Sequence, residues 1–224
     1  MALLETSPCA ARGGAVLTLP RGLTFDEATH VFRRSRLGRT VEVPSVTSVL
    51  KRCGLITPAE QARWTEAARA RGIRVHRALY LLQRQSDDAA LFTLEPEDIA
   101  YYEAGKLALN TFGIDVLAVE ELVDGESYAG WLDLRCRLRG ESLPVVLDFK
   151  SGSVPAYAPL QLSGYAAPLD AQHRRGVIVL QRNGDPKLIM FRDDLADARL
   201  WKAALTVALL QIEWEGKSVE RCTL

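Results

Sequence analysis

The chain has 224 residues, of which 48% are hydrophobic, and its 28 lysines and arginines balance 28 aspartates and glutamates. This length supports one substantial core, so we expect a tail or edge strand over residues 1–22 and a single domain over 23–224. The balanced charge excludes binding of a polyanion by overall charge, so such a partner must meet a local basic patch.

The cysteines and the N-terminal residues restrict the cellular setting. Cys9, Cys53, Cys136 and Cys222 lack the paired short spacings of zinc or iron–sulfur sites, which predicts reduced thiols. Glu5 and the absence of a basic segment before an apolar run predict no secretory signal. No apolar run is long enough to span a bilayer, so we expect a soluble intracellular protein without a membrane partner.

The first elements in chain order are a hairpin and a short helix. Residues 28–32 and 40–43 are extended runs around an arginine-rich segment, which predicts a hairpin whose basic tip is either a solvated loop or a DNA contact. Residues 44–54 predict a short helix, with Ser45 as the N-cap and Gly54 just past its end.

Longer helices follow. The capping box Thr57-Pro-Ala-Glu60 predicts a helix that runs to about residue 70. Residues 73–85 form an amphipathic segment with His76 at the edge of its apolar face, where a histidine is more typical of a boundary residue than of a metal ligand. Acids early in residues 96–113 and a glycine at the end predict a third helix.

The pattern turns extended after residue 113. Residues 114–123 and 127–138 predict two strands around Asp124-Gly125, which brings Glu120 near the next strand. Helical spacing in residues 156–168 puts Gln161 and Tyr165 on one face.

The C-terminal third adds two strands and a helix. Residues 176–182 and 187–191 flank Asn183-Gly184, a strong hairpin signal, and an amphipathic helix over about 195–214 is expected to cover the sheet. The order of elements predicts an α/β protein with a mixed central β-sheet flanked by α-helices and a helical N-terminal half.

Residues 129–150 bring acids and a lysine together. Leu132 to Leu138 alternate with polar residues, and if Gly140-Glu141 is the loop, Asp133 lies directly opposite Asp148. Carboxylates about 5 Å apart repel, so a cation is expected between them, with Lys150 on the same side. The pattern predicts a metal site beside a lysine; a salt-bridged, exposed sheet face is the alternative.

Five short motifs follow one another over residues 23–170: Val43-Pro-Ser-Val-Thr-Ser-Val-Leu50, Arg71-Gly-Ile-Arg-Val-His76, Gly130-Trp-Leu-Asp133, Asp148-Phe-Lys150 and Gln161-Leu-Ser-Gly-Tyr165. Their order and spacing resemble those of RecB-like nucleases of the PD-(D/E)XK superfamily, of the phage and mitochondrial single-domain type. The resemblance implies a restriction-endonuclease-like core. It also changes the interpretation of the histidine from a boundary residue to a ligand.

The resemblance implies a bound Mg²⁺ or Mn²⁺ held by three side chains and one backbone carbonyl: His76, Asp133, Asp148 and Phe149. It implies that Lys150 positions or activates the attacking water, and that Gln161 and Tyr165 brace the site. Glu120 matches an acidic strand position less specifically and is a second-tier candidate. The four-cysteine framework of some relatives is missing, so no iron–sulfur cluster is predicted.

Seven residues are candidates for contact with DNA: Ser45, Thr47, Arg71, Arg74, Arg77, Trp131 and Arg135. The arginines would neutralise phosphates without reading base sequence. Trp131 stands where relatives carry a small or hydroxyl residue, and an indole there would narrow the groove or stack on a base.

We therefore expect a metal-dependent deoxyribonuclease, specifically an exonuclease acting on single strands or duplex ends in repair, recombination or phage DNA processing. The alternatives are a structure-specific endonuclease and a non-catalytic DNA-binding or assembly module on the same fold. The resemblance implies a cytoplasmic protein of bacterial or phage origin. A helicase or recombination protein would be a separate partner, and the motifs suit a monomer or an oligomer equally.

Overall fold

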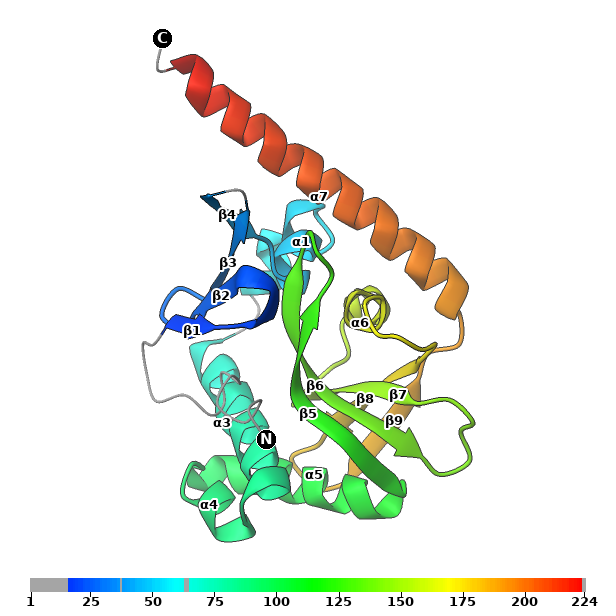
Figure 1. Ribbon diagram of the computed structural model, residues 1–224. Coiled ribbons are helices and arrows are strands. Elements are labelled where there is room, and N and C mark those ends of the chain that lie inside the picture. The colour runs from blue at the N-terminus through cyan, green and yellow to red at the C-terminus, as the bar shows by residue number, and fades with distance from the viewer. Residues whose placement is uncertain (1–15, 37, 63–64, 223–224) are drawn as a thin grey trace.

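The computed structural model describes residues 16–36, 38–62 and 65–222 and contains two β-sheets (Figure 1). The first is antiparallel, with the strand order β1 (Val16–Thr18), β2 (Leu23–Asp26), β3 (Val31–Arg36) and β4 (Arg39–Val43). The second has the order β5 (Ile114–Asp124), β6 (Ala129–Leu138), β7 (Val145–Lys150), β8 (Arg174–Leu180) and β9 (Pro186–Met190). Because β7 and β8 are parallel and the other neighbours antiparallel, this five-stranded sheet is mixed, as predicted.

Helices cover both faces of the mixed sheet. Their bounds are η1 (Pro20–Gly22), α1 (Val46–Arg52), α2 (Pro58–Ala62), α3 (Glu66–Arg84), α4 (Asp87–Leu91), η2 (Pro96–Asp98), α5 (Ile99–Thr111), α6 (Ala158–Ala166) and α7 (Asp194–Cys222). One core lies between the sheet and α3 and α5, and a second lies between the sheet and α1, α6 and α7. The α/β class is therefore confirmed. Among the described residues, no helix is both long and apolar enough to cross a membrane.

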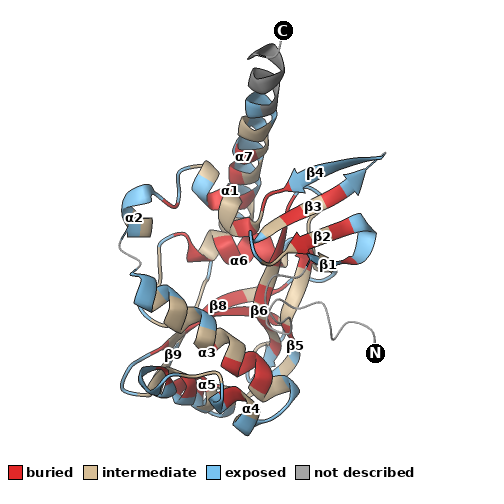
Figure 2. Cartoon of the chain, turned by 90° about the vertical axis from the view of Figure 1, so that its left-hand side faces the viewer, coloured by how far each residue is buried: buried red, intermediate tan, exposed pale blue. Residues whose placement is uncertain are grey.

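Strand β7 stands between these two cores. Val145, Leu147 and Phe149 face the core of α3 and α5, whereas Val146 faces the core of α6 and α7. Both faces are buried, as expected for a strand that is central and parallel to one neighbour. Figure 2 shows these central strands largely in the colour of buried residues. Any polar side chain on β7 is thus placed in a poorly solvated environment.

The expected pairing of β6 and β7 is confirmed, but the expected loop is wrong. Leu134 pairs with Leu147 and Cys136 with Val145, which is the register that sets Asp133 against Asp148. The strands are joined by residues 139–144 rather than by a two-residue turn. Pro144 within this connection cannot donate a hydrogen bond to the ladder, which explains why pairing begins only at residue 145.

Strand β6 also changes face, contrary to the expected alternation. Leu134, Cys136 and Leu138 pack in the core of α3 and α5, but Leu132 packs in the other core. The strand changes face at Asp133, whose side chain lies between the two cores. A simple two-residue periodicity cannot show such a change of face.

The helical prediction for residues 57–85 is partly wrong. The capping box is confirmed, since Thr57 and Glu60 each accept a hydrogen bond from the backbone N–H of the other residue. That helix ends at Ala62, however, and α3 runs from Glu66 through Gly72 to Arg84 without a break. Thr65 caps α3 by accepting a hydrogen bond from the N–H of Ala68. This single cap is a weaker sequence signal than the capping box at Thr57, so the sequence did not indicate that a second helix begins here.

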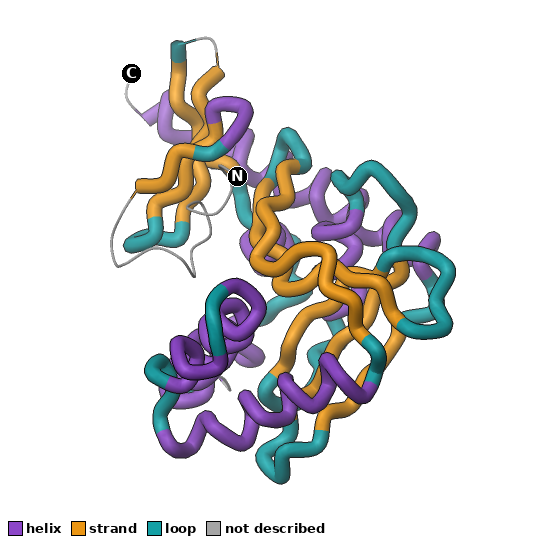
Figure 3. The backbone as a smooth tube through the Cα atoms, turned by 60° about the horizontal axis from the view of Figure 1, so that its bottom comes forward, coloured by secondary structure: helices purple, strands orange, loops and turns teal. Residues whose placement is uncertain are grey.

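The helical N-terminal half is also only partly correct, because residues 16–43 form the four-stranded sheet. Phe25 and Phe32 alternate with polar residues and pack against Trp131 of β6. Figure 3 shows this sheet as a layer beside the β5–β6 hairpin. An ion pair between Arg34 of β3 and Asp124 of β5 joins this sheet to the mixed sheet, and only 5% of the Arg34 side chain is exposed. Arg34 therefore lies within β3 and is not part of a basic loop.

We predict that Arg34→Met destabilises the protein by about 3–5 kcal/mol, because it leaves the Asp124 carboxylate poorly solvated and without its ionic partner. Arg33→Met is the matched control: its side chain is 41% exposed and its ion pair with Asp26 spans 3.5 Å, so a change below about 1 kcal/mol is expected. Urea unfolding measures both variants. Equal losses would mean that the Arg34–Asp124 pair does not hold the two sheets together.

Candidate metal centre

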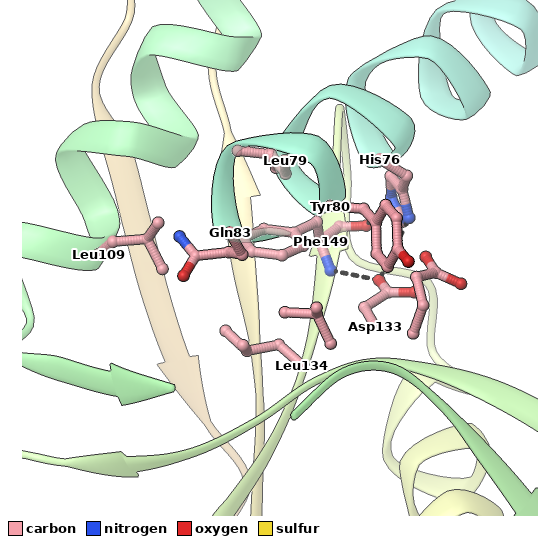
Figure 4. Close-up of a pocket in the computed structure, with 10 residues that line it drawn as sticks. His76, Leu79, Tyr80, Gln83, Leu109, Asp133, Leu134 and Phe149 are labelled. Carbon is pink, nitrogen blue, oxygen red and sulfur yellow. Dashed lines mark hydrogen bonds and ion pairs between the residues drawn. The ribbon is translucent and has the colours of Figure 1, made fainter. Parts of the chain in front are cut away.

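His76 lies on α3 with its ring directed at the adjoining strands (Figure 4). Its neighbours Val75 and Leu79 are buried in the core, which places the imidazole at the edge of the apolar face. The ring Nε2 is 3.0 Å from the carbonyl oxygen of Phe149 and Nδ1 is 3.4 Å from Oδ2 of Asp133. Since a carbonyl can only accept, Nε2 carries the proton of that hydrogen bond, and Nδ1 faces the carboxylate.

The Asp133 side chain takes the place of a backbone hydrogen-bond acceptor between β6 and β7. Its Oδ2 accepts a hydrogen bond of 2.9 Å from the backbone N–H of Phe149. The backbone pairs of the ladder end at Leu134 and Leu147, so the carboxylate takes over where the strands separate. This contact orients the carboxylate by backbone geometry rather than by a flexible side chain.

Glu120 reaches the same place through an unusual backbone. The register of β5 shifts between Val116 and Ala118, and Glu120 has a φ of 46° inside the strand. A left-handed conformation in a non-glycine residue costs on the order of 1–3 kcal/mol and persists where surrounding structure enforces it. Glu120 lies with His76 and Asp133, such that one ligand atom from each lies within 4.8 Å of the others.

Asp148 and Lys150 form a second, adjacent unit. Asp148 is 4% exposed, and its Oδ2 lies 2.6 Å from Nζ of Lys150. Lys150 also donates to Oε1 of Gln161 at 3.3 Å, and Nε2 of Gln161 donates to the hydroxyl of Tyr165 at 3.5 Å. The predicted association of these four residues is present in the structure. They form a polar line from β7 to the buried face of α6.

The proximity cluster and the predicted ligand set share His76 and Asp133. Glu120, a second-tier candidate, belongs to the three-residue cluster, whereas Asp148 is held by Lys150 and is not one of the three. The carbonyl of Phe149 accepts the hydrogen bond from His76, so its role here is to fix the histidine tautomer. Glu120 lies between the pairs Val119–Leu134 and Glu121–Leu132, so the register of β5 and β6 places it beside Asp133.

Crowded carboxylates shift the acidities of the site. Burial lowers the pKa of His76, but the charges of Asp133, Asp148 and Glu120 outweigh burial and raise this pKa to about 9. Burial raises the pKa of Asp148 to about 6, against the opposing effect of Lys150. Burial also raises the pKa of Asp133, but His76 and Lys150 outweigh it and bring this pKa below its usual value. The cluster therefore attracts positive charge.

Two hollows adjoin the centre. A small one of about 10 Å³ lies among His76, Glu120, Asp133 and the apolar residues beside them, and Tyr80, one helical turn after His76, also lines it. A larger cleft of about 410 Å³ opens on the side of Lys150. Its other walls are Arg69, the loop of residues 151–153 and Tyr157. Lys150 can thus be reached from solvent, and Tyr80 and Arg69 line these hollows although neither belongs to one of the five motifs.

Several candidates for DNA contact have partners within the chain. Arg74 donates to both carboxylate oxygens of the buried Asp98, and the Arg71 guanidinium lies 4.8 Å from the ring centroid of Tyr101. Arg135 donates to both oxygens of Glu121. Trp131 is partly buried and packs against the rings of Phe25 and Phe32 in the four-stranded sheet. Half-buried positions are also occupied by Thr47 and Arg77.

Three of the sequence motifs meet through packing. Ser45 caps α1 by accepting from the N–H of Ser48, and it forms an isolated bridge with Ala129. The next residue, Gly130, faces Tyr165: a Cβ there would lie 2.8 Å from the Tyr165 ring and 3.2 Å from Val46. The glycine is therefore required for the close approach of α6, and the role of Ser45 is to end the preceding strand and begin a helix.

We predict that Gly130→Ala costs about 1–3 kcal/mol of stability, because Tyr165 and Val46 must move to admit the methyl group. The control is Gly72→Ala, since a Cβ there meets nothing within 4 Å and the residue lies inside α3. That control is expected to stabilise the protein by up to about 1 kcal/mol through helix propensity. Denaturant unfolding distinguishes the two, and an unchanged stability of Gly130→Ala would contradict the packing argument.

We predict that Mn²⁺ affinity rises about tenfold per pH unit between pH 6.5 and 9, because a cation at Nδ1 must displace a proton from His76. The raised pKa of His76, about 9, sets the upper limit of this range, and the pKa of Asp148, about 6, lies below it. Calorimetry in buffers of different ionisation enthalpy counts the released proton. His76→Gln should bind more weakly and without this dependence; a flat profile in the parent protein would contradict the site.

Comparisons with known proteins leave the family open. No family model matches the sequence, and no curated protein matches it. A solved structure described as "Crystal structure of SSO0001" matches over 62% of this chain and 74% of that chain, with 16% sequence identity and a TM-score of 0.29. A likeness of this size carries no argument about function, which has to come from the geometry of the centre.

Proposed function

We propose that this protein is a metal-dependent DNA nuclease, a RecB-like member of the PD-(D/E)XK superfamily with a restriction-endonuclease-like core. The proposal is carried by one observation: the cluster of His76, Glu120 and Asp133 lies beside the Asp148–Lys150 pair at the end of a central strand. The motif resemblance supports the assignment independently, because four of these five residues belong to its motifs.

The cluster suits Mg²⁺ or Mn²⁺. It offers two carboxylates, which are ligands for hard cations, and one imidazole, which suits Mn²⁺ at least as well as Mg²⁺. The raised pKa of His76 reflects the excess of negative charge that a cation would neutralise. When bound, the cation supplies a lowered pKa for water and neutralisation of charge on the phosphate oxygens.

The remaining residues have roles that their contacts support. Lys150 is held between Asp148 and Gln161, so its ammonium group is fixed at the wall of the cleft, where it would position a water or contact a phosphate oxygen. Tyr165 and Gln161 limit the motion of that ammonium from the side of α6. Arg69 and the loop of residues 151–153 line the path by which a phosphodiester strand would enter.

The substrate in this proposal is single-stranded DNA or a duplex end, degraded as an exonuclease in repair, recombination or phage DNA processing. Any helicase or recombination partner would be a separate protein. The features of the centre disfavour a purely DNA-binding module, since strain at Glu120 and the burial of Asp148 with Lys150 both cost stability that binding alone would not require.

We predict that linear end-labelled DNA is degraded with Mn²⁺ or Mg²⁺ and not with EDTA, while circular DNA resists. Lys150→Ala should lower turnover by about 10²–10³-fold, the range expected on removal of a group that stabilises charge in the transition state, with little change in DNA binding. The matched control is Lys187→Ala, an exposed lysine on β9, which should retain full activity.

Each outcome of this assay is informative. Cutting of the circle by the parent protein, but not by Lys150→Ala, would replace the exonuclease with a structure-specific endonuclease. Retained DNA binding without cleavage under any metal would support the non-catalytic module. Full activity of Lys150→Ala would show that the site assignment is wrong.

A further inference from the structure

The free end of the β3–β4 hairpin brings two arginines together. Arg36 and Arg39 are directly opposite each other in the register of these strands, so their side chains share one face of the sheet. Both residues are exposed, and Figure 2 shows this hairpin projecting from the body of the protein. Like charges in directly opposed positions destabilise a pair of strands. An anion that binds both guanidinium groups would therefore stabilise the end of the hairpin.

The charges of Arg36 and Arg39 are not neutralised within the fold. Arg34, on the same face of β3, is engaged in the ion pair with Asp124. Arg36 donates a hydrogen bond of 3.3 Å to a backbone carbonyl, that of Glu126, which carries no net charge. Within the described part of the chain, neither Arg36 nor Arg39 forms an ion pair with a carboxylate. Both guanidinium groups can therefore accept an anionic partner from solution.

Two further cations border the adjoining turn between β5 and β6. A cleft of about 370 Å³ is lined by Asp124 and Glu126 of this turn and by the exposed side chains of Arg21 and Lys202. Among the residues that the structure describes, neither Arg21 nor Lys202 has an ion pair. Since Asp124 is neutralised by Arg34, positive charge exceeds negative charge around the turn. We call the four cations the hairpin patch: Arg21, Arg36, Arg39 and Lys202.

The hairpin patch lies toward the same edge of the mixed sheet as Lys150. Strands β6 and β7 are antiparallel, so β6 begins at Ala129 on the edge where β7 ends at Lys150. The turn that the patch borders directly precedes Ala129. From Ala129 to Asp133 the strand rises about 13 Å, at about 3.3 Å per residue. Duplex DNA covers this distance in about four base pairs, so one nucleic acid can reach both places.

We propose that the hairpin patch binds the phosphate backbone of the nucleic acid, away from the metal centre. The identity of this ligand rests on the proposed function. A guanidinium group binds two phosphate oxygens at once, and two opposed groups can hold neighbouring phosphates. Such contacts add affinity without reading base sequence. The patch supplies the local basic surface that a chain without net charge needs in order to bind a polyanion.

The test is binding of a fluorescein-labelled DNA duplex to the full chain in EDTA, measured by fluorescence anisotropy over a series of salt concentrations. Arg36→Gln and Arg39→Gln should each weaken binding about five- to tenfold near physiological salt and lower the salt slope by about 0.9, as expected for one lost phosphate contact. Arg33→Gln is the matched control. It removes the same charge from the opposite face of the same hairpin, where Arg33 pairs with Asp26, so a change below about twofold is expected.

Conservative variants separate a phosphate contact from a structural role. Arg36→Lys and Arg39→Lys keep the charge, so both should bind within about threefold of the parent protein with the parent salt slope. Far-ultraviolet circular dichroism checks that all variants are folded.

The outcomes distinguish this inference from the nuclease proposal. If the parent binds the duplex and both glutamine variants keep its affinity and salt slope, the hairpin patch is not a phosphate site, whether or not the protein cleaves DNA. Weaker binding and a lower slope in these variants would support the patch even if no metal yields cleavage. A parent protein that binds vesicles of anionic lipid but not the duplex would overturn the inference.

Discussion

The concentration of negative charge at the end of β7 is the constraint on which the rest of the structure depends. Glu120, Asp133 and Asp148 converge where both faces of the sheet are covered, so water can solvate them only poorly. The protein balances them with a proton on His76 and the ammonium group of Lys150. Burial of these charges costs stability that packing alone does not require, in agreement with the proposed metal centre.

The two cores bring the parts of this centre from opposite sides of the sheet. Helix α3 delivers His76 from one face, while α6 delivers Gln161 to Lys150 from the other. Helix α6 is in turn supported by Tyr128, which donates a hydrogen bond to the carbonyl of Gly164 and packs against Trp201 of α7. Helix α6, supported by α7, thus contacts the centre through Lys150, although neither helix supplies a member of the three-residue cluster.

The four-stranded sheet gives several motif residues a structural explanation. It covers Trp131, pairs Arg34 with Asp124 at the end of β5 and leads through Pro44 into the cap at Ser45. Arginines near the motif helix are likewise engaged within the chain, as Arg74 is with Asp98. The cleft beside Lys150, which Arg69 also lines, is the side on which we propose that a nucleic acid binds.

The sequence by itself determined the local order: the capping boxes, the β6–β7 register, the mixed sheet and the grouping of Asp133, Asp148 and Lys150 all follow from short-range patterns. Only the tertiary structure decided the positions of residues that depend on irregular backbone or on partners far away in the sequence. The left-handed Glu120 joins His76 and Asp133 in one cluster, the strand of Asp133 changes face at that residue, and Trp131 packs against the sheet of residues 16–43. The physical reason is that periodicity describes regular helices and strands, whereas the centre lies where β5 and β6 depart from regular strand geometry.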